Sequence, residues 1–389
     1  DTGLWDVEQI EVYRGPQSTS NGRNSIAGAV YMTTKAPTQD FEGAVRVGYR
    51  NQDSYLDTAA VVSGALVEDV LAFRLSTQYV DGETFSNPPV YETNPTDREL
   101  NKLNTSSTRA KLLYTPSQDL SVQLTYSTYS EEGNSGRKYF LADEPFDYEP
   151  LYQRIMDTES DTTQVNVDYK INDDFSLDVL VAYMDYKWGF EAYEPLESAE
   201  SDVSMDESNI TVDTKLNFGL SNDFYSGFVG LAYFDRDQDF ESVGATNYYG
   251  DDSSKSTAIY GETSFNLSRD FTLTAGLRIE REEQLRNFNM AFRGDMLVEQ
   301  LDNSHTLRLP KLAIQYDISD ETTLFASARR GYNAGGGALD FTAEDYYYYD
   351  EETVNTYEIG SRSVLNNGDI NISANVFYNN FNGYPKLSS

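Results

Sequence analysis

Apolar and polar residues alternate along most of this chain, and the alternation constrains its fold more than any other feature. Clear examples begin at Leu71, Leu120, Ile210 and Phe271, each continuing over several pairs of residues. A period of two, with one apolar and one polar face, is typical of β-strands that are buried on one side. The chain is therefore predicted to be all-β after residue 37.

The lengths of the connections separate a membrane barrel from a soluble sandwich. Short turns recur at intervals of roughly 50 residues, the spacing of strand, long loop, strand and short turn. They lie near Val67, Pro116, Asn172, Ser221, Ser268, Ser319 and Asn367. The polar segments between them are predicted to be long loops: 81–104, 131–158, 191–205, 241–252, 285–303 and 331–350. Tight turns at one end and long loops at the other are typical of a transmembrane antiparallel β-barrel, here with about fifteen strands.

Composition excludes several classes of function. The chain has no cysteine, which excludes disulfides and thiolate metal sites, and one histidine. This residue, His305, cannot by itself supply a catalytic triad or a histidine-based metal centre, and we expect it at the start of a strand. No catalytic residue, metal or cofactor is predicted. A net charge of −35 argues against nucleic acid as a partner. The acidity fits a solvated surface, a charged lumen or an outer face that binds divalent cations.

A distinctive segment precedes the strands, VEQIEVYRGPQSTSNGRNSIAGAVYMTTKAP at residues 7–37. Its Gly15-Pro16 step is expected to end a strand, because proline has no N–H and has a fixed φ. The Asn21-Gly22 step is a strong turn signal. The small residue Gly28 allows another backbone to approach closely.

This segment closely resembles the end of the plug domain in TonB-dependent outer-membrane receptors. The family pattern is I-E-V-x-R-G-P, then G-R-N, then I-x-G-A/V and T-K-x-P. The plug-motif residues here are Gly15, Pro16, Gly22, Arg23 and Gly28. Segments 324–337, 351–362 and 369–381 resemble barrel strands of the same family.

The resemblance implies both an organisation and a function. Residues 1–37 would be the C-terminal part of the plug, and residues 38–389 the N-terminal and central part of a barrel of about 22 strands. The chain would then be a fragment of a monomeric receptor in the outer membrane of a Gram-negative bacterium, surrounded by lipid and lipopolysaccharide. TonB would engage an N-terminal segment that is missing here. The imported ligand would be a ferric siderophore, the branch that the motifs resemble most.

Other functions remain possible at this stage. Oligosaccharide, haem and corrinoid are ligands of other branches of the family. A passive porin has similar strands and loops, but it has no plug, so residues 7–37 argue against it. A barrel enzyme lacks a visible nucleophile–histidine–carboxylate set.

The resemblance also implies a lock between plug and barrel. In the family, the arginine of the R-G-P motif meets glutamates on the inner wall of the barrel. Here that arginine is Arg14, and Glu358 and Glu262 are the candidate partners. Alternation places both glutamates on the inward face. The alternative is a solvated glutamate and an arginine that is bonded within the plug.

Aromatic residues in the predicted loops are the candidates for ligand binding. They could stack on a catecholate, haem or sugar, and a loop cation could meet an anionic ligand. The candidates are Tyr248, Tyr249, Tyr332, Tyr346, Tyr347, Tyr348 and Tyr349, together with Arg137. The alternative is that these rings pack on one another within their loops.

Overall fold

The computed structural model describes most of the chain. The described residues are 4–51, 54–83, 99, 102–134, 140–141, 149–150, 153–193, 201–244, 247–292, 295–340 and 345–383.

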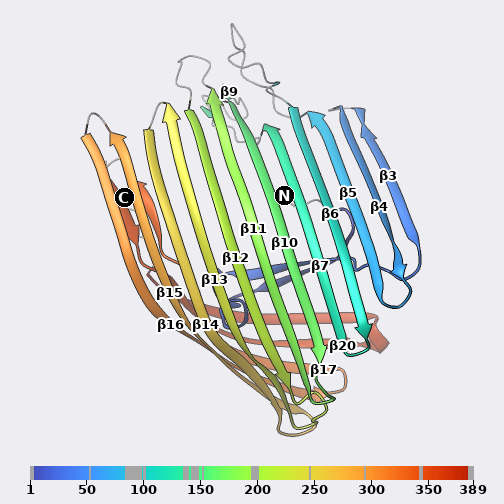
Figure 1. Cartoon of the computed structure of the whole chain (residues 1–389). Helices are drawn as coiled ribbons and strands as arrows, with labels where there is room; N and C mark the ends of the chain where they lie inside the picture. Colours follow the sequence, from blue (N-terminus) through green and yellow to red (C-terminus); the bar gives the residue numbers. More distant parts are fainter. Residues whose placement is uncertain are drawn as a thin grey trace.

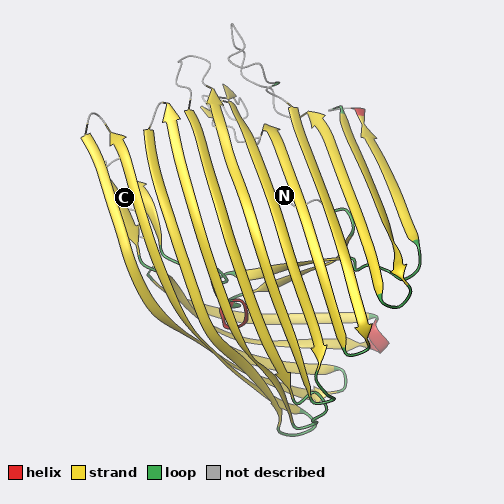
Figure 2. Cartoon of the chain, in the orientation of Figure 1, coloured by secondary structure: helices red, strands yellow, loops and turns green. Residues whose placement is uncertain are grey.

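One antiparallel sheet of fifteen strands accounts for nearly all of the structure (Figures 1 and 2). Its strands are β3 (Glu42–Arg50), β4 (Tyr55–Val67), β5 (Leu71–Glu83), β6 (Lys102–Ser117), β7 (Leu120–Asn134), β10 (Gln153–Lys170), β11 (Phe175–Tyr193), β12 (Ser201–Phe218), β13 (Tyr225–Gly244), β14 (Asn247–Asn266), β15 (Phe271–Phe292), β16 (Asp295–Ser319), β17 (Thr322–Asn333), β20 (Glu352–Leu365) and β21 (Ile370–Asn382). Each strand pairs with its neighbours in chain order, with β3 and β21 at the two edges. The predicted meander of about fifteen strands is confirmed.

The N-terminal residues form a separate unit inside the curve of this sheet. Strand β1 (Val7–Arg14) pairs with β2 (Gly28–Thr34), and the short helix α1 (Ser18–Asn21) lies between them. We call β1, α1, β2, the residues that join them and the adjoining residues Asp6 and Lys35 the N-terminal hairpin. Figure 1 shows it crossing behind the front strands, with the large sheet bending around it.

The remaining elements are short. Strand β8 (Phe140–Leu141) pairs with β9 (Glu149–Pro150), and β18 (Gly336–Asp340) pairs with β19 (Asp345–Tyr349). A 3₁₀ turn, η2 (Asn366–Gly368), joins the last two strands of the large sheet. Within the described ranges, no helix is long and apolar enough to cross a membrane.

All seven short turns lie where the sequence predicts them. At the turn between β10 and β11, the side chain of Asn172 accepts hydrogen bonds from the backbone N–H groups of residues 174 and 175, at 2.8 and 2.9 Å. Asn222 makes the same contacts between β12 and β13. Asparagine favours such turns because its side-chain oxygen can accept hydrogen bonds from backbone N–H groups that have no partner on a neighbouring strand.

Two of the predicted long loops are wrong. Strands β13 and β14 are paired up to Ser242 and Tyr248, with Glu241 opposite Tyr249. Strands β15 and β16 are paired up to Phe292 and Asp295, with Asn289 opposite Val298. Charged and amide side chains such as Asp251 and Asn287 interrupt both segments, but apolar side chains such as Phe288 remain. Their backbone groups still form the ladder, which does not depend on the polarity of the side chains.

The two faces of the large sheet differ as the alternation predicts. Outward-facing apolar side chains are exposed, with Leu231 at 61% and Ile259 at 58%, whereas the inward-facing Tyr260 is only 3% exposed. Buried residues therefore lie on the inner face, around the N-terminal hairpin. This is the reverse of a soluble sheet with one solvated face, and it fits an outer surface in contact with lipid.

Tyrosines lie at the edge of the outward apolar band, on the side of the strand extensions. The hydroxyl of Tyr183 donates to Asp185, and that of Tyr233 donates to Asp235, both at 2.8 Å. Beyond these pairs the outward positions of β13 are acidic, with Asp237 and Asp239 following Asp235. Part of the negative charge therefore lies on the outer face of the strand extensions.

Candidate functional site

The tip of the N-terminal hairpin is bonded to the inner wall formed by β16 and β17. The hydroxyl of Ser18 accepts a hydrogen bond from the backbone N–H of Tyr332 at 3.1 Å. The hydroxyl of Thr19 donates to the carbonyl of Leu309, also at 3.1 Å. Both hydroxyl-bearing residues are at most 5% exposed. Helix α1 is therefore docked on this wall by buried bonds between side chain and backbone.

A buried ion pair fastens the same end of the hairpin to β15. Arg23 Nη2 lies 2.8 Å from Glu282 Oε1, and the carboxylate side chain is fully buried. Gln284 donates to Glu282 at 3.0 Å, and His305 Nε2 lies 3.5 Å from its other oxygen. The guanidinium of Arg23 also lies 5.0 Å from the centre of the Phe234 ring, within the range of a cation–π contact.

The other end of the hairpin is fastened to β5 and β6. Arg74 Nε donates to Asp6 at 2.7 Å, and its Nη2 donates to the second oxygen of the same carboxylate. Both side chains are 4% exposed. Lys111 Nζ donates to the carbonyl oxygens of Thr34 and Lys35, each at 2.9 Å. The hairpin is thus held by charged groups at opposite ends.

The expected ion pair between Arg14 and Glu358 is not the contact that the structure shows. One oxygen of Glu358 lies 2.8 Å from Arg329 Nη2, and the other accepts from Asn375 at 2.8 Å. Arg329 Nη2 also donates to the backbone carbonyl of Arg14, at 3.3 Å. Among the described residues, no ion pair involves the exposed side chain of Arg14. A wall arginine therefore takes the place of the hairpin arginine, because the sheet already holds it beside Glu358.

The second candidate, Glu262, also has a partner from its own sheet. Lys311 Nζ lies 2.8 Å from Glu262 Oε2. Gly276 is in register with both residues, on the strand between them. Because glycine has no side chain, the lysine reaches across it to the carboxylate.

The plug-motif glycines have backbone conformations that suit glycine. Gly15 has a φ of +74° and Gly22 a φ of +72°, in the left-handed region that other residues rarely adopt. At Gly28, with a φ of +150°, an added Cβ would lie 2.2 Å from the Tyr13 carbonyl oxygen. Pro16 is buried against the wall.

Three of the candidate tyrosines meet in a group of five rings, the aromatic cluster. Its members are Phe240, Tyr248, Phe288, Tyr346 and Tyr348. The rings of Phe288 and Tyr346 are stacked, with centroids 3.7 Å apart and planes 10° apart. Tyr248 lies 6.0 Å from Phe288, and Tyr348 lies 5.4 Å from Tyr346. Phe288 was missed because the alternation that turns it inward continues through a predicted loop, and Phe240 lies one residue before another such loop.

Tyr332 does not belong with these rings. It is fully buried, and its hydroxyl donates to Glu280 at 2.8 Å. Its backbone N–H is the group that binds Ser18. Tyr332 was expected in a loop, but it lies in β17, where the hairpin contacts its backbone.

The other candidates lie in three different places. Tyr249 is on the outer face, 47% exposed, with its hydroxyl 3.4 Å from Asp239. Tyr347 and Tyr349 are in β19 and pair with the backbone of β18. Arg137 lies outside the described residues.

Two guanidinium groups are found on the inner wall close to the aromatic cluster. Asp252 Oδ2 is 3.1 Å from Arg236 Nη2 and 3.0 Å from Arg286 Nε, and the three side chains are 9–19% exposed. Arg286 also donates to the carbonyl of Gly335, next to β18, at 3.0 Å. Arg236 Nη1 also lies 3.8 Å from Glu207 Oε2, so two carboxylates balance the two guanidinium groups. Burial raises the pKa of Tyr348 to about 12, so its hydroxyl stays protonated and able to donate a hydrogen bond.

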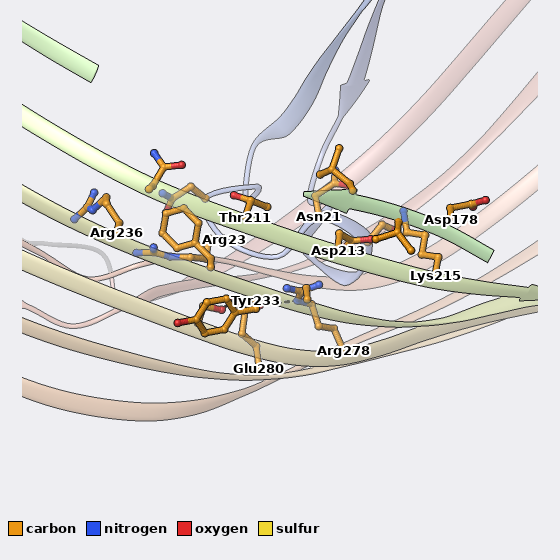
Figure 3. A pocket seen from close by; sticks show the side chains of 18 of the residues that line it. Asn21, Arg23, Asp178, Thr211, Asp213, Lys215, Tyr233, Arg236, Arg278 and Glu280 are labelled. Carbon is orange, nitrogen blue, oxygen red and sulfur yellow. Dashed lines mark hydrogen bonds and ion pairs between the residues drawn. The ribbon is translucent and has the colours of Figure 1, made fainter. Parts of the chain in front are cut away.

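A cavity of about 760 Å³ separates the tip of the hairpin from the wall of β10–β15 (Figure 3). Asn21 and Arg23 line its hairpin side. Thr211 lies near its middle in the view, Arg236 toward one end and Asp178 toward the other. The hairpin is therefore bonded to β15–β17 but leaves a polar space on the side of β10–β13.

His305 is another residue whose position differs from expectation. It lies inside β16 rather than at the start of a strand, and its side chain is 17% exposed. Glu282 and Glu351 are its acidic neighbours, at 3.5 and 3.9 Å. Its contacts join it to the buried charges around Arg23.

Comparison with known proteins identifies the family. The family model described as TonB dependent receptor-like, beta-barrel, matches residues 113–388. The chain belongs to the TonB-dependent receptors, which are transport receptors of the Gram-negative outer membrane and not enzymes. The predicted class, fold and location are confirmed.

Individual relatives are distant in sequence. The pesticin receptor of Yersinia enterocolitica is 22% identical over 402 residues, which cover 96% of this chain and 56% of the relative. The ferric yersiniabactin uptake receptor FyuA from Yersinia pestis has a TM-score of 0.83 at 16% identity, covering 96% of this chain and 60% of that one. The ferripyoverdine receptor of Pseudomonas aeruginosa has a TM-score of 0.75 at 16% identity, covering 96% and 53%. The chain thus spans little more than half the length of these proteins.

Proposed function

We propose that the protein containing this chain imports a ferric siderophore through the outer membrane by TonB-coupled active transport. In this proposal residues 1–37 are the end of the plug, and residues 38–389 belong to the barrel. The observation that carries it is the N-terminal hairpin, which lies within the curve of the barrel sheet and is fastened there by buried ion pairs. The resemblance of solved siderophore receptors supports the choice of ligand.

The hairpin contacts suit a pore that is closed at rest. Arg23–Glu282 and Asp6–Arg74 are each an ion pair between a hairpin residue and a wall residue. Such pairs fix orientation, and breaking one leaves a buried charge without its partner. TonB would supply the force that separates them. A passive porin has no use for such an arrangement.

The aromatic cluster and the two wall arginines are the proposed ligand contacts. Stacked rings favour flat aromatic groups. Arg236 and Arg286 offer guanidinium groups to an anionic complex, in exchange for their contacts with Asp252 and Glu207. Both features fit a catecholate or phenolate complex of iron better than a neutral oligosaccharide.

Growth on defined iron sources tests the proposal. The full-length gene is expressed in an iron-starved host that lacks its own siderophore receptors, with and without TonB. Ferric catecholate, ferric yersiniabactin, ferric hydroxamate, haem, cobalamin and maltooligosaccharide are supplied singly. We expect growth on a ferric siderophore only when TonB is present. Equal uptake without TonB would show a passive channel, and uptake confined to a non-siderophore ligand would show another branch.

Two tyrosine variants locate the ligand contact in the same assay. Tyr346→Ala removes a ring from the aromatic cluster. Tyr249→Ala is its matched control, because that ring lies on the outer face. Weaker ligand binding is expected for the first variant and not for the second.

A further inference from the structure

Two wall arginines lie where the side chains of two hairpin glycines would be. A Cβ added at Gly15 would lie 2.7 Å from Arg329 Nη2. The same nitrogen donates to the carbonyl of Arg14 and lies 2.8 Å from Glu358. The guanidinium thus occupies space left by a missing side chain, contacts the hairpin backbone there and is neutralised by its own wall.

The second glycine repeats the arrangement. A Cβ added at Gly22 would lie 2.6 Å from Arg278 Nη2. Arg278 Nε donates to Glu280 at 2.6 Å, and the guanidinium lies 5.0 Å from the centre of the Tyr260 ring. Arg278 is 5% exposed, and Glu280 is fully buried. This arginine too is fixed by its own wall and presses against a glycine of the hairpin.

In a third contact between the same surfaces, the glycine is on the wall and the side chain is on the hairpin. A Cβ added at Gly331, on β17, would lie 2.6 Å from the Cβ of Pro16. Here a hairpin side chain fills the space above a wall glycine. Residues 15–22 therefore fit β15–β17 through three close approaches, each of which requires a glycine.

We propose that Arg329 and Arg278 are positioning residues that hold the plug in its resting place by occupying the spaces above Gly15 and Gly22. This inference rests on the proposed function, in which the hairpin is the end of the plug. In this inference the barrel wall supplies the two arginines, each of which is paired with a carboxylate of the wall. The hairpin supplies the two glycines and, at Arg14, a backbone carbonyl group. Because a guanidinium is flat and rigid, it can enter such a space and still bond a carboxylate at its edge.

A double-mutant cycle separates this contact from ordinary glycine strain. Alanine at Gly15 or Gly22 is strained by the positive φ alone. That strain is the same whether or not the arginine is present, whereas the collision disappears when the arginine is shortened. The matched pairs are Gly15→Ala with Arg329→Ala, and Gly22→Ala with Arg278→Ala. The mismatched pairs exchange the two arginines and serve as controls.

The measurement is backbone hydrogen exchange in β1 and β2 of the purified full-length receptor. Each glycine variant is expected to speed exchange about tenfold, as a strained residue outside the glycine region would. In a matched pair, the double variant is expected to exchange at least threefold more slowly than the product of the two single effects. In a mismatched pair, the two effects should multiply. Multiplication in both kinds of pair would overturn the proposal.

Lysine variants keep the test decisive if alanine at a glycine releases the hairpin fully. Arg329→Lys keeps a positive charge near Glu358 but lacks the flat guanidinium that fills the space above Gly15. Exchange in β1 is expected to rise severalfold while the thermal unfolding of the barrel stays unchanged. Wild-type exchange in this variant would overturn the role of the guanidinium. None of these measurements uses a ligand or TonB, so their outcome is independent of whether the transport assay succeeds.

Discussion

Removal of the charge of Glu282 is expected to loosen the N-terminal hairpin more than any other single neutralisation on the inner wall. The variant Glu282→Gln keeps the shape of the side chain. In the wild type, this fully buried carboxylate lies 2.8 Å from Arg23, whose side chain is 14% exposed. The variant leaves Arg23 largely buried beside a neutral group.

The free-energy cost of Glu282→Gln follows from how deeply the ion pair is buried. Breaking a buried ion pair by removing one partner costs about 3–5 kcal/mol. Arg23 keeps some contact with water and with the ring of Phe234. The expected loss is therefore nearer the value of a hydrogen bond between charged groups, about 2–3 kcal/mol. That corresponds to opening of the hairpin that is about 30- to 150-fold more frequent.

Hydrogen exchange of the hairpin in the full-length receptor measures this opening. The matched control is Glu283→Gln, one residue away on the outer face. Glu283 is 51% exposed and pairs with Arg281, which is 60% exposed. Exposed pairs contribute about 0–1 kcal/mol, and this one does not touch the hairpin. Less than a threefold change in hairpin exchange for Glu282→Gln, or an equal change in both variants, would refute the reasoning.

Three further predictions concern other buried contacts. Asp6→Asn removes one of the two carboxylates that pair with Arg74, the other being Glu42. The variant should lower the urea concentration at which the start of the hairpin is released, as followed by a fluorescent label there, and an unchanged midpoint would contradict a role for this pair. Tyr346→Phe should leave the stability of the β18–β19 pair intact. Tyr346→Ala should lower that stability by about 1 kcal/mol more than the loss of buried apolar area accounts for, as measured by hydrogen exchange. Equal effects of the two variants would mean that the hydroxyl, not the ring stack, matters. Tyr260→Phe removes the hydroxyl that lies 2.7 Å from both carboxylate oxygens of Asp213. The variant should destabilise the barrel by about 1–3 kcal/mol in urea unfolding. No measurable loss of stability would show that water replaces the hydroxyl.

Local patterns in the sequence were sufficient for the fold class. The period of two and the turn chemistry at residues such as Asn172 and Asn222 are properties of short segments, so they can be interpreted without a partner. The loop boundaries could not be predicted in this way. Residues 241–252 mix acidic, small and aromatic residues, and such a composition alone does not distinguish a loop from a paired strand beyond the apolar band.

The candidate site was predicted in part. Alternation placed Glu358 and Glu262 on the inner face, and the structure places both there. Three of the tyrosines that the sequence marked as candidates for ligand binding, Tyr248, Tyr346 and Tyr348, meet in the aromatic cluster. Phe288 was missed because its segment, 285–303, was interpreted as a loop, and Phe240 lies one residue before another predicted loop.

What the sequence determined by itself is the face on which each strand residue lies and the identity of the hairpin segment. These follow from a repeat of two residues and from an ordered motif. The tertiary structure alone decided which charged groups meet. Glu262 pairs with Lys311 because Gly276 leaves a gap between their strands, and Glu358 pairs with Arg329. Such partners are tens to hundreds of residues apart in sequence, and only the register and curvature of the sheet bring them together.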